Sequence, residues 1–333
     1  MVVNFKSYIC CPPSYGGFVK NVEIITIESD FGAGKKGAKL GPQAFLNCFN
    51  SNLKNKLPIT RIESNHLEEE EPYPGNFAKN IESIFEVQKL ALSAIENAIE
   101  ANSLPWIISG DHSNGLAGIS AYRNLYPNNT LGVIWIDAHA DLHTPFTSPS
   151  GNMHGMPLAA ALGLRKTATG KNNLDKESML LWDNLINLGS NQINPKIAPN
   201  NLVFLELRDL EAEEIELLNS LEIKNYTPEQ RKAIGLNQLL EEINAQLSNC
   251  DHILVSFDVD SLDPTISFGT GTPVPGGLLW EEAVDLLSAL LQSPKLIAFE
   301  TTEINPLLDR ANPMEEVSAK LIEEVFEKSG FLN

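Results

Sequence analysis

The stretch LGVIWIDAHAD, residues 131–141, combines the strongest strand signal in the chain with its most distinctive polar residues. LGVIWI is an apolar, β-branched run of the length expected for a buried strand. Asp137, His139 and Asp141 follow at alternate positions. Alternation at a strand end directs side chains to one side, so two carboxylates and an imidazole would face a common point. Such a triplet favours a bound cation, although an exposed polar strand end is the alternative for this motif alone.

Similar short apolar runs lie on both sides of this stretch, at 22–27, 104–108, 202–207, 252–257 and 296–299. Segments with helical spacing lie between them, among them 80–102 and 237–248. The alternation predicts an α/β fold, with three α/β/α layers and a mostly parallel central sheet. Residues 68–74 and 166–176 are expected to be exposed loops rather than linkers. Because the candidate functional residues are spread from 109 to 305, we expect residues 1–333 to form a single catalytic domain.

The composition excludes several classes of partner. Acidic residues outnumber basic ones by 43 to 24, giving a formal charge of -19, so nucleic acid and anionic membranes would be repelled. The same charge would attract a cationic small molecule, although an acidic surface that aids solubility is the commoner explanation. No apolar run approaches the roughly 18 residues of a membrane span, and no secretory signal is evident, so a cytoplasmic location is expected. The cysteines lack disulfide-framework or CxxC spacing and are expected to be reduced: Cys10, Cys11, Cys48 and Cys250.

Three further predicted strands end in polar residues. The run 104–108 leads into His112, the run 252–257 into Asp258 and Asp260, and the run 296–299 into the segment 300–305. Taken singly, the two aspartates are typical of a solvated turn and His112 of a hydrogen-bonded histidine. In a parallel sheet, however, ligands bind beyond the carboxyl ends of the strands, where these residues would meet Asp137, His139 and Asp141.

Together these motifs supply more ligands than one tetrahedral ion needs. Mixed carboxylate and imidazole ligation without thiolate favours Mn²⁺, with Co²⁺ or Fe²⁺ as alternatives. We therefore expect a binuclear centre that holds a nucleophilic hydroxide between its two ions.

The ordered motifs resemble the signatures of the arginase (ureohydrolase) family. They are SGDHS (109–113), DAHADLHTPFTSPSGNMHG (137–155), SFDVDSLDP (256–264), GTGTP (269–273) and EINP (303–306), with weaker similarity at 32–42 and 207–209. The resemblance covers most of the chain. It implies an arginase-like fold, a homo-oligomer, and hydrolysis of a cationic guanidino compound to urea and an amine by attack of the metal-bridging hydroxide on the guanidinium carbon.

The resemblance also implies individual roles. One ion would be bound by His112, Asp137, Asp141 and Asp258, and the other by His139, Asp137, Asp258 and Asp260, so that Asp137 and Asp258 bridge. His154 would move protons and Glu303 would bind the guanidinium, with Asp141 also counted as catalytic. A carboxylate can accept the planar guanidinium in bidentate geometry, and an imidazole near neutral pKa can protonate the departing amine. Outside the motifs, both residues would be ordinary loop or cap residues.

The segment LHTPFTSPSGNM, residues 142–153, resembles arginases more than agmatine hydrolases and predicts arginine as substrate. The implied substrate-binding residues are His143, Ser148, Ser150, Asn152, Glu211 and Glu214. Three positions depart from the family pattern: His143 replaces an asparagine, Glu211 an aspartate and Ser109 a glycine. Neutral drift is one interpretation, and a far end of the pocket reshaped for another guanidino acid is the other.

Two alternative functions stay open at this point. The same metal centre could hydrolyse agmatine, guanidinobutyrate or a formimino amino acid instead of arginine. A member of another class, a non-catalytic binding protein with this fold, is the second alternative. The complete ligand set argues against it, because the loss of a metal ligand would mark such a protein.

Overall fold

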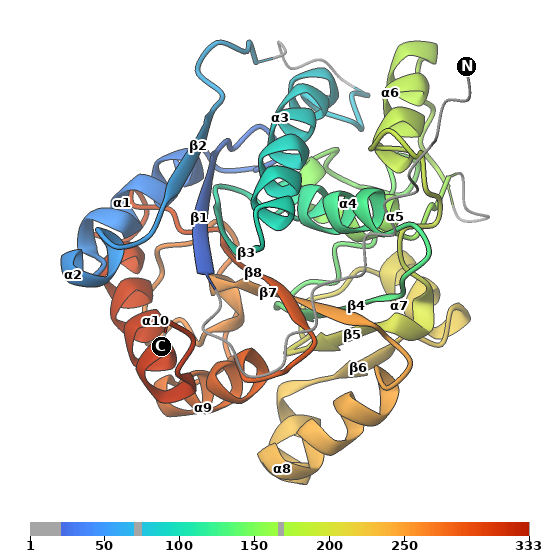
Figure 1. The fold of residues 1–333 in the computed structure, drawn as a ribbon. Helices are drawn as coiled ribbons and strands as arrows, with labels where there is room; N and C mark the ends of the chain where they lie inside the picture. Colours follow the sequence, from blue (N-terminus) through green and yellow to red (C-terminus); the bar gives the residue numbers. More distant parts are fainter. Residues whose placement is uncertain (1–20, 70–74, 166–169, 333) are drawn as a thin grey trace, which may run out of the picture.

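The computed structural model describes residues 21–69, 75–165 and 170–332. In these residues eight parallel strands form one sheet in the order β2-β1-β3-β8-β7-β4-β5-β6 (Figure 1). The strands are β1 (Asn21–Glu28), β2 (Ile59–Glu63), β3 (Ser103–Ser109), β4 (Leu131–Ile136), β5 (Leu202–Leu205), β6 (Lys224–Tyr226), β7 (His252–Asp258) and β8 (Leu296–Thr302). The predicted α/β fold is confirmed, and the sheet is parallel throughout.

Each predicted strand is present, with differences at the ends. β5 ends at Leu205 rather than at residue 207, because Glu206 has a left-handed backbone with φ of 74°. β8 continues past residue 299 to Thr302, where its polar residues keep pairing with β7 up to Asp258. The short outer strands β2 and β6 were not predicted.

Helices cover both faces of the sheet (Figure 1). One apolar layer packs under α3 to α7, and the other under α1, α8, α9 and α10. The helices are α1 (Gly41–Cys48), α2 (Ser51–Lys54), α3 (Ile81–Glu100), α4 (Gly115–Leu125), α5 (Pro157–Ala161), α6 (Lys176–Ile186), α7 (Ala212–Ser220), α8 (Pro228–Gln246), α9 (Trp280–Leu291) and α10 (Met314–Ser329).

The expected helix over 80–102 is α3, whereas the helix expected over 237–248 is only the second part of α8. The first part begins at Pro228, where the Thr227 hydroxyl accepts a hydrogen bond from Gln230 N. Gly235, with φ of 75°, interrupts the helical conformation between the two parts. Because of this break, the sequence pattern predicted only the second part of the helix.

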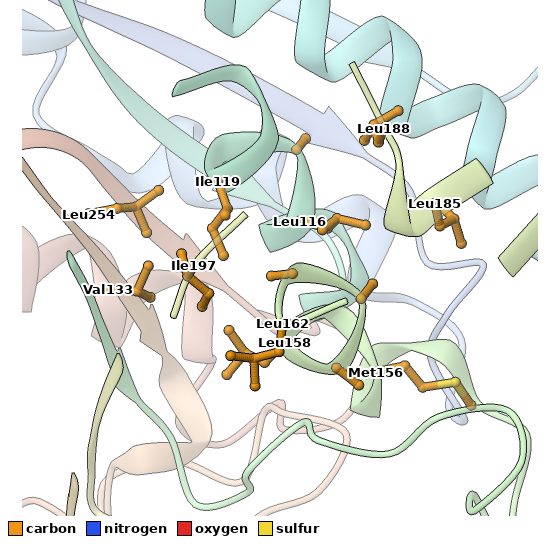
Figure 2. Close-up of a cluster of buried hydrophobic side chains, with 14 of the residues drawn as sticks. Leu116, Ile119, Val133, Met156, Leu158, Leu162, Leu185, Leu188, Ile197 and Leu254 are labelled. Carbon is orange, nitrogen blue, oxygen red and sulfur yellow. The ribbon is translucent and has the colours of Figure 1, made fainter. Parts of the chain in front are cut away.

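The layer under α3 to α7 packs against the strands that lead into the predicted ligands. Figure 2 shows Leu116 and Ile119 of α4 in a buried cluster with Val133 of β4 and Leu254 of β7. β4 and β7 are neighbours in the sheet, so this cluster fixes the two strands that carry most of the predicted ligands. Packing on the sheet face therefore determines geometry at the sheet edge.

Of the remaining sequence predictions, some concern residues that the structure describes and others do not. Residues 70–74 and 166–169, Cys10 and Cys11 lie outside the described residues, while Cys48 and Cys250 are free thiols. Residues 68–69 are exposed and irregular, and 170–175 have no regular structure before α6 begins at Lys176. Across the described ranges, no helix is both long and apolar enough to cross a bilayer.

Gly110 offers a test of this architecture, since it joins three strand ends. Its N–H donates to Ile27 O, and its carbonyl accepts from Glu303 N. A Cβ on Gly110 would overlap the backbone carbonyl of Ser29 and lie 3.2 Å from Ala38 O. Because backbone cannot move aside by a rotamer change, Gly110→Ala should lower the free energy of unfolding by about 1–3 kcal/mol in urea titrations. Gly155→Ala is the control, since its Cβ would meet only Asp141 Oδ1 at 3.9 Å. Equal unfolding midpoints for both variants would contradict this packing.

Candidate functional site

Four neighbouring strands, β3, β8, β7 and β4, end at one edge of the sheet. The loops that follow them, together with loops near α5 and α7, surround one pocket. All of the predicted site residues line it: His112, Asp137, His139, Asp141, His143, Ser148, Ser150, Asn152, His154, Glu211, Glu214, Asp258, Asp260 and Glu303. The structure therefore brings them together, and their individual roles stay predictions.

The first cluster at the pocket floor is centred on the His112 imidazole. Its Nδ1 lies 2.9 Å from Asp137 Oδ2, 3.1 Å from Asp258 Oδ2 and 3.2 Å from Asp141 Oδ2. A single imidazole N–H cannot satisfy three carboxylates at once. The arrangement has the donor set and the close spacing of a metal site.

A second cluster adjoins the first. His139 Nδ1 lies 3.0 Å from Asp260 Oδ2 and 3.3 Å from Asp137 Oδ1. Asp137 therefore directs one carboxylate oxygen into each cluster. The two groups with metal-ligand spacing, His112 with Asp137 and Asp258, and His139 with Asp137 and Asp260, share this residue.

Four carboxyl groups are buried close together at the floor, so bound cations would stabilise their charged forms. Asp137, Asp141, Asp258 and Asp260 are at most 6% exposed. Burial, with the charges of Asp260 and Asp137, raises the pKa of Asp258 well above its usual value. Burial and the charge of Asp137 raise the pKa of Asp141 to about 6, and Asp141 Oδ2 lacks a hydrogen-bond partner among the described residues. Divalent ions would offset the repulsion between these carboxylates and would give Asp141 Oδ2 a partner, so the residues present fit a metal centre.

The orientation of His112 is fixed from the side that faces away from the carboxylates. Its ring stacks on that of Trp135, with the ring centroids 3.9 Å apart, and its Nε2 lies 2.8 Å from Ser256 Oγ. Ser256 Oγ donates to Glu300, which also accepts from Ser109 Oγ. Such contacts hold a ligating histidine in one orientation and one tautomer.

His154 and Glu303 lie beside the first cluster. His154 Nδ1 is 3.2 Å from Glu303 Oε1, which also accepts a hydrogen bond from His112 N. Burial lowers the pKa of His154, but the hydrogen bond and charge of Glu303, with Asp141 and Asp111, outweigh it and raise the pKa to about 9. Cations at the neighbouring carboxylates would oppose that rise.

The far end of the pocket is formed by the 143–152 loop and the start of α7. Ser148 Oγ accepts from Gly151 N, and Ser150 Oγ from Asn152 N. The side-chain Oδ1 of Asn152 accepts from Lys79 Nζ at 3.0 Å. These bonds set the loop that presents hydroxyls to the pocket.

Glu211, Glu214 and His143 complete this end. His143 Nε2 lies 2.6 Å from Glu211 Oε2 and 3.8 Å from Glu214 Oε2. Burial raises the pKa of Glu214 to about 7, and its two oxygens accept from the backbone N–H groups of Leu142 and Glu211. The three side chains form a third group of histidine and carboxylate atoms, separate from the two clusters at the floor.

Sequence reasoning gave no role to several residues at the site. Thr272 Oγ1 donates to Asp260 Oδ2 at 3.1 Å, and Asp209 Oδ2 lies 3.7 Å from His139 Nε2. Both residues occur in stretches with family-like sequence, which was the available signal. The Ser256–Glu300 contact depends on the register of β7 against β8, which no local pattern reveals.

A parallel sheet whose carboxyl edge holds two buried histidine and aspartate clusters, joined by a shared carboxylate, has the ligands of a two-metal hydrolase. Comparison with known proteins agrees. A model of the arginase family matches residues 20–327. The arginase of Staphylococcus aureus is 33% identical over 319 residues, covering 92% of this chain and 97% of that protein.

Solved structures give the same result. The chain superposes on the arginase of Bacillus caldovelox with a TM-score of 0.79 and 29% identity, covering 92% of this chain and 98% of that one. For the arginase of Entamoeba histolytica in complex with L-ornithine, the TM-score is 0.78 and the identity 28%, covering 94% and 99%. The chain belongs to the arginase family. It is a metal-dependent ureohydrolase that acts on C–N bonds, and its family uses a binuclear metal centre.

The clusters predict how metal and stability are coupled. Adding Mn²⁺ to the chelated protein should raise its melting temperature, because a ligand that binds only the folded state stabilises it by about 2.7 kcal/mol at 100 times its dissociation constant. Asp258→Asn should reduce this shift strongly. Without metal, the same variant should be at least as stable as the unmodified protein, since its amide replaces a carboxyl whose ionisation is opposed by burial and by the charges of Asp260 and Asp137.

Asp263→Asn is the matched control, because Asp263 bonds Thr265 N and Gly276 N in a turn and does not line the pocket. It should retain the full Mn²⁺ shift. Thermal unfolding with and without metal measures both effects. An Asp258→Asn protein with an undiminished shift would contradict the assignment of this carboxylate to the metal centre.

Proposed function

We propose that this ureohydrolase converts L-arginine to L-ornithine and urea, with two Mn²⁺ ions as cofactor. The observation that carries the proposal is a single pocket with two chemically different ends. Its floor has buried carboxylates and imidazoles, and its far end has hydroxyls, carboxylates and an imidazole suited to an amino acid. Relatives at about this similarity are named arginase, which supports the choice of arginine.

In this proposal one ion is held by His112, Asp137, Asp141 and Asp258, and the other by His139, Asp137, Asp258 and Asp260. When bound, the ions lower the pKa of water and stabilise the negative charge that develops on the substrate. The chain supplies their fixed positions. Asp137 directs an oxygen to each cluster, and Ser256 holds the His112 ring so that Nδ1 faces the carboxylates.

Two residues beside the first cluster orient the substrate and transfer a proton. Glu303 accepts N–H bonds from the planar guanidinium and so orients its carbon toward the floor. His154 transfers a proton to the departing amine, and the contact between its Nδ1 and Glu303 Oε1, 3.2 Å away, holds the imidazole in position. Because these groups are buried or half-buried, few water molecules compete for them.

The far end recognises the amino-acid part of the substrate. Ser148, Ser150, Asn152 and His143 face the α-carboxylate, and Glu211 and Glu214 face the α-amino group. Manganese as the resident metal, a single catalytic domain, a homo-oligomeric assembly and a cytoplasmic location stay predictions from the sequence.

The substrate proposal predicts the outcome of a urea-release assay. The Mn²⁺-loaded enzyme should show a kcat/KM for arginine at least about tenfold above those for agmatine, guanidinobutyrate and a formimino amino acid, because only arginine offers both a free α-ammonium and an α-carboxylate to the groups at the far end. Exhaustive chelation should abolish the activity and Mn²⁺ should restore it. A preference for agmatine would refute arginine as the substrate and leave the metal chemistry intact.

The role of His154 can be separated from metal binding. His154→Ala should lower kcat by about 10²- to 10⁴-fold, the usual contribution of a positioned proton donor, while elemental analysis finds unchanged metal content. Glu303→Gln should also retain metal but raise KM for arginine, because the guanidinium loses a charged acceptor. His66→Ala, at an exposed turn, is the control and should alter neither value. Loss of metal in His154→Ala would contradict the assigned role.

A further inference from the structure

Two family-like stretches of the sequence, residues 207–209 and 269–273, have no role in the proposed mechanism. The side chain of Arg208 connects them. Its Nη2 donates to Val274 O at 3.0 Å, one residue past the second stretch, and to Asp260 O at 2.6 Å. Arg208 therefore joins the segment after β5 to two further loops, and one of these loops carries a predicted metal ligand.

These bonds depend on the shape of an arginine side chain. Nη1 donates to Glu206 O at 2.9 Å, while Nη2 donates to Asp260 O and Val274 O. A guanidinium has five N–H donors in one rigid plane and can reach several carbonyls at once, whereas a lysine has a single nitrogen on a flexible stem. Arg208 is half-buried, and a Cβ on Gly277 would lie 2.6 Å from Nη2, so neighbouring atoms enclose the guanidinium.

The contacts of Arg208 converge on the second metal cluster. Its backbone N–H donates at 3.0 Å to the carbonyl of Ala138, the residue before His139. Ala138 N in turn donates to Asp260 Oδ1 at 3.2 Å. Thr272 Oγ1, in the loop that Arg208 anchors, donates to the other carboxylate oxygen of Asp260, which lies 3.0 Å from His139 Nδ1. Arg208 is thus connected to both of the ligands that only this cluster contains.

Other residues orient the first cluster. The His112 ring is held by its stacking on Trp135 and by its contact with Ser256. Within the described residues, the side-chain hydrogen bonds of Arg208 go to backbone carbonyls, and none of them goes to His112 or Asp141. A change at Arg208 should therefore affect the two metal sites unequally.

Resting on the metal ligands assigned under the proposed function, we propose that Arg208 is a positioning residue for the ion bound by His139 and Asp260. It fixes the backbone beside each ligand, so that the imidazole and the carboxylate lie near enough to bind one cation together. Residues that orient metal ligands typically contribute about 10- to 100-fold to metal affinity. Arg208 does not line the pocket, so its effect on catalysis is exerted through this ion.

Calorimetric titration of the metal-free protein with Mn²⁺ tests the proposal. Arg208→Lys keeps the positive charge but loses the planar set of donors, so it should weaken one of the two ions about 10- to 100-fold and leave the other unchanged. The Mn²⁺ concentration that gives half-maximal urea release should rise by the same factor. At saturating Mn²⁺, KM for arginine should equal that of the unmodified protein.

Arg231→Lys is the matched control, because it is the same substitution at a second arginine close to the end of β5. Arg231 pairs with Glu206, which is fully buried, and with Glu282 Oε2 at 3.1 Å. The variant should lower the melting temperature, because Glu206 loses part of its pairing, and should retain both Mn²⁺ affinities. A loss of stability alone would therefore not account for a weakened ion.

Two further variants identify the affected ion. In a protein that already carries Asp260→Asn, Arg208→Lys should not weaken the remaining ion further. Thr272→Val removes the hydroxyl that donates to Asp260 Oδ2 and keeps the side-chain volume at an exposed position. It should weaken the same ion as Arg208→Lys, by about tenfold.

Unchanged affinities in a folded Arg208→Lys protein, equal weakening of both ions, or further weakening in the Asp260→Asn protein would overturn the inference. If Arg208→Lys does not fold, Thr272→Val decides in the same way, and two unchanged affinities would overturn the inference. An unmodified protein that binds fewer than two ions would overturn the metal assignment of the proposed function and this inference with it.

Discussion

The structure depends on one electrostatic constraint: four aspartates lie buried beside two imidazoles at one edge of the sheet. Their negative charges need nearby positive charge to be stable. Burial and mutual repulsion raise the pKa of Asp258 and Asp141, and Asp141 Oδ2 has no hydrogen-bond partner among the described residues. Carboxylates in such surroundings are stable only when protonated or bound to cations. Two ions can bind only where ligands from several strands meet. The strand order allows this, because β3, β8, β7 and β4 are neighbours and end together.

Backbone conformation at the edge is adapted to this demand. Asp141 and Glu303 both have positive φ, of 52° and 65°, which non-glycine residues seldom adopt. Both residues line the pocket, Glu303 directly after β8 and Asp141 from the loop that follows β4. Conformations of this kind persist at functional sites because the surrounding packing holds them, here the apolar layers on both faces of the sheet.

The sequence was sufficient for the sheet core and for the histidines and aspartates that meet at its edge, because both have local signals. The runs of β3, β4, β7 and β8 are apolar, and alternation after β4 marks Asp137, His139 and Asp141 as sharing one side. Long-range contacts have no such signal. The Ser256–Glu300 bond depends on strand register, and the His143–Glu211 bond joins residues 68 positions apart. The short outer strands β2 and β6 lacked a sufficiently apolar pattern, and Gly235 divided α8.

The most direct test of the account is the number of ions that depend on Asp137, the carboxylate shared by the two clusters. Calorimetric titration of the metal-free enzyme with Mn²⁺ should give two ions per chain for the unmodified protein. Asp260→Asn, which affects one cluster only, should retain one tightly bound ion, whereas Asp137→Asn should weaken both sites together. One ion per chain in the unmodified protein, or two ions bound at normal affinity in Asp137→Asn, would contradict a binuclear centre built on this residue.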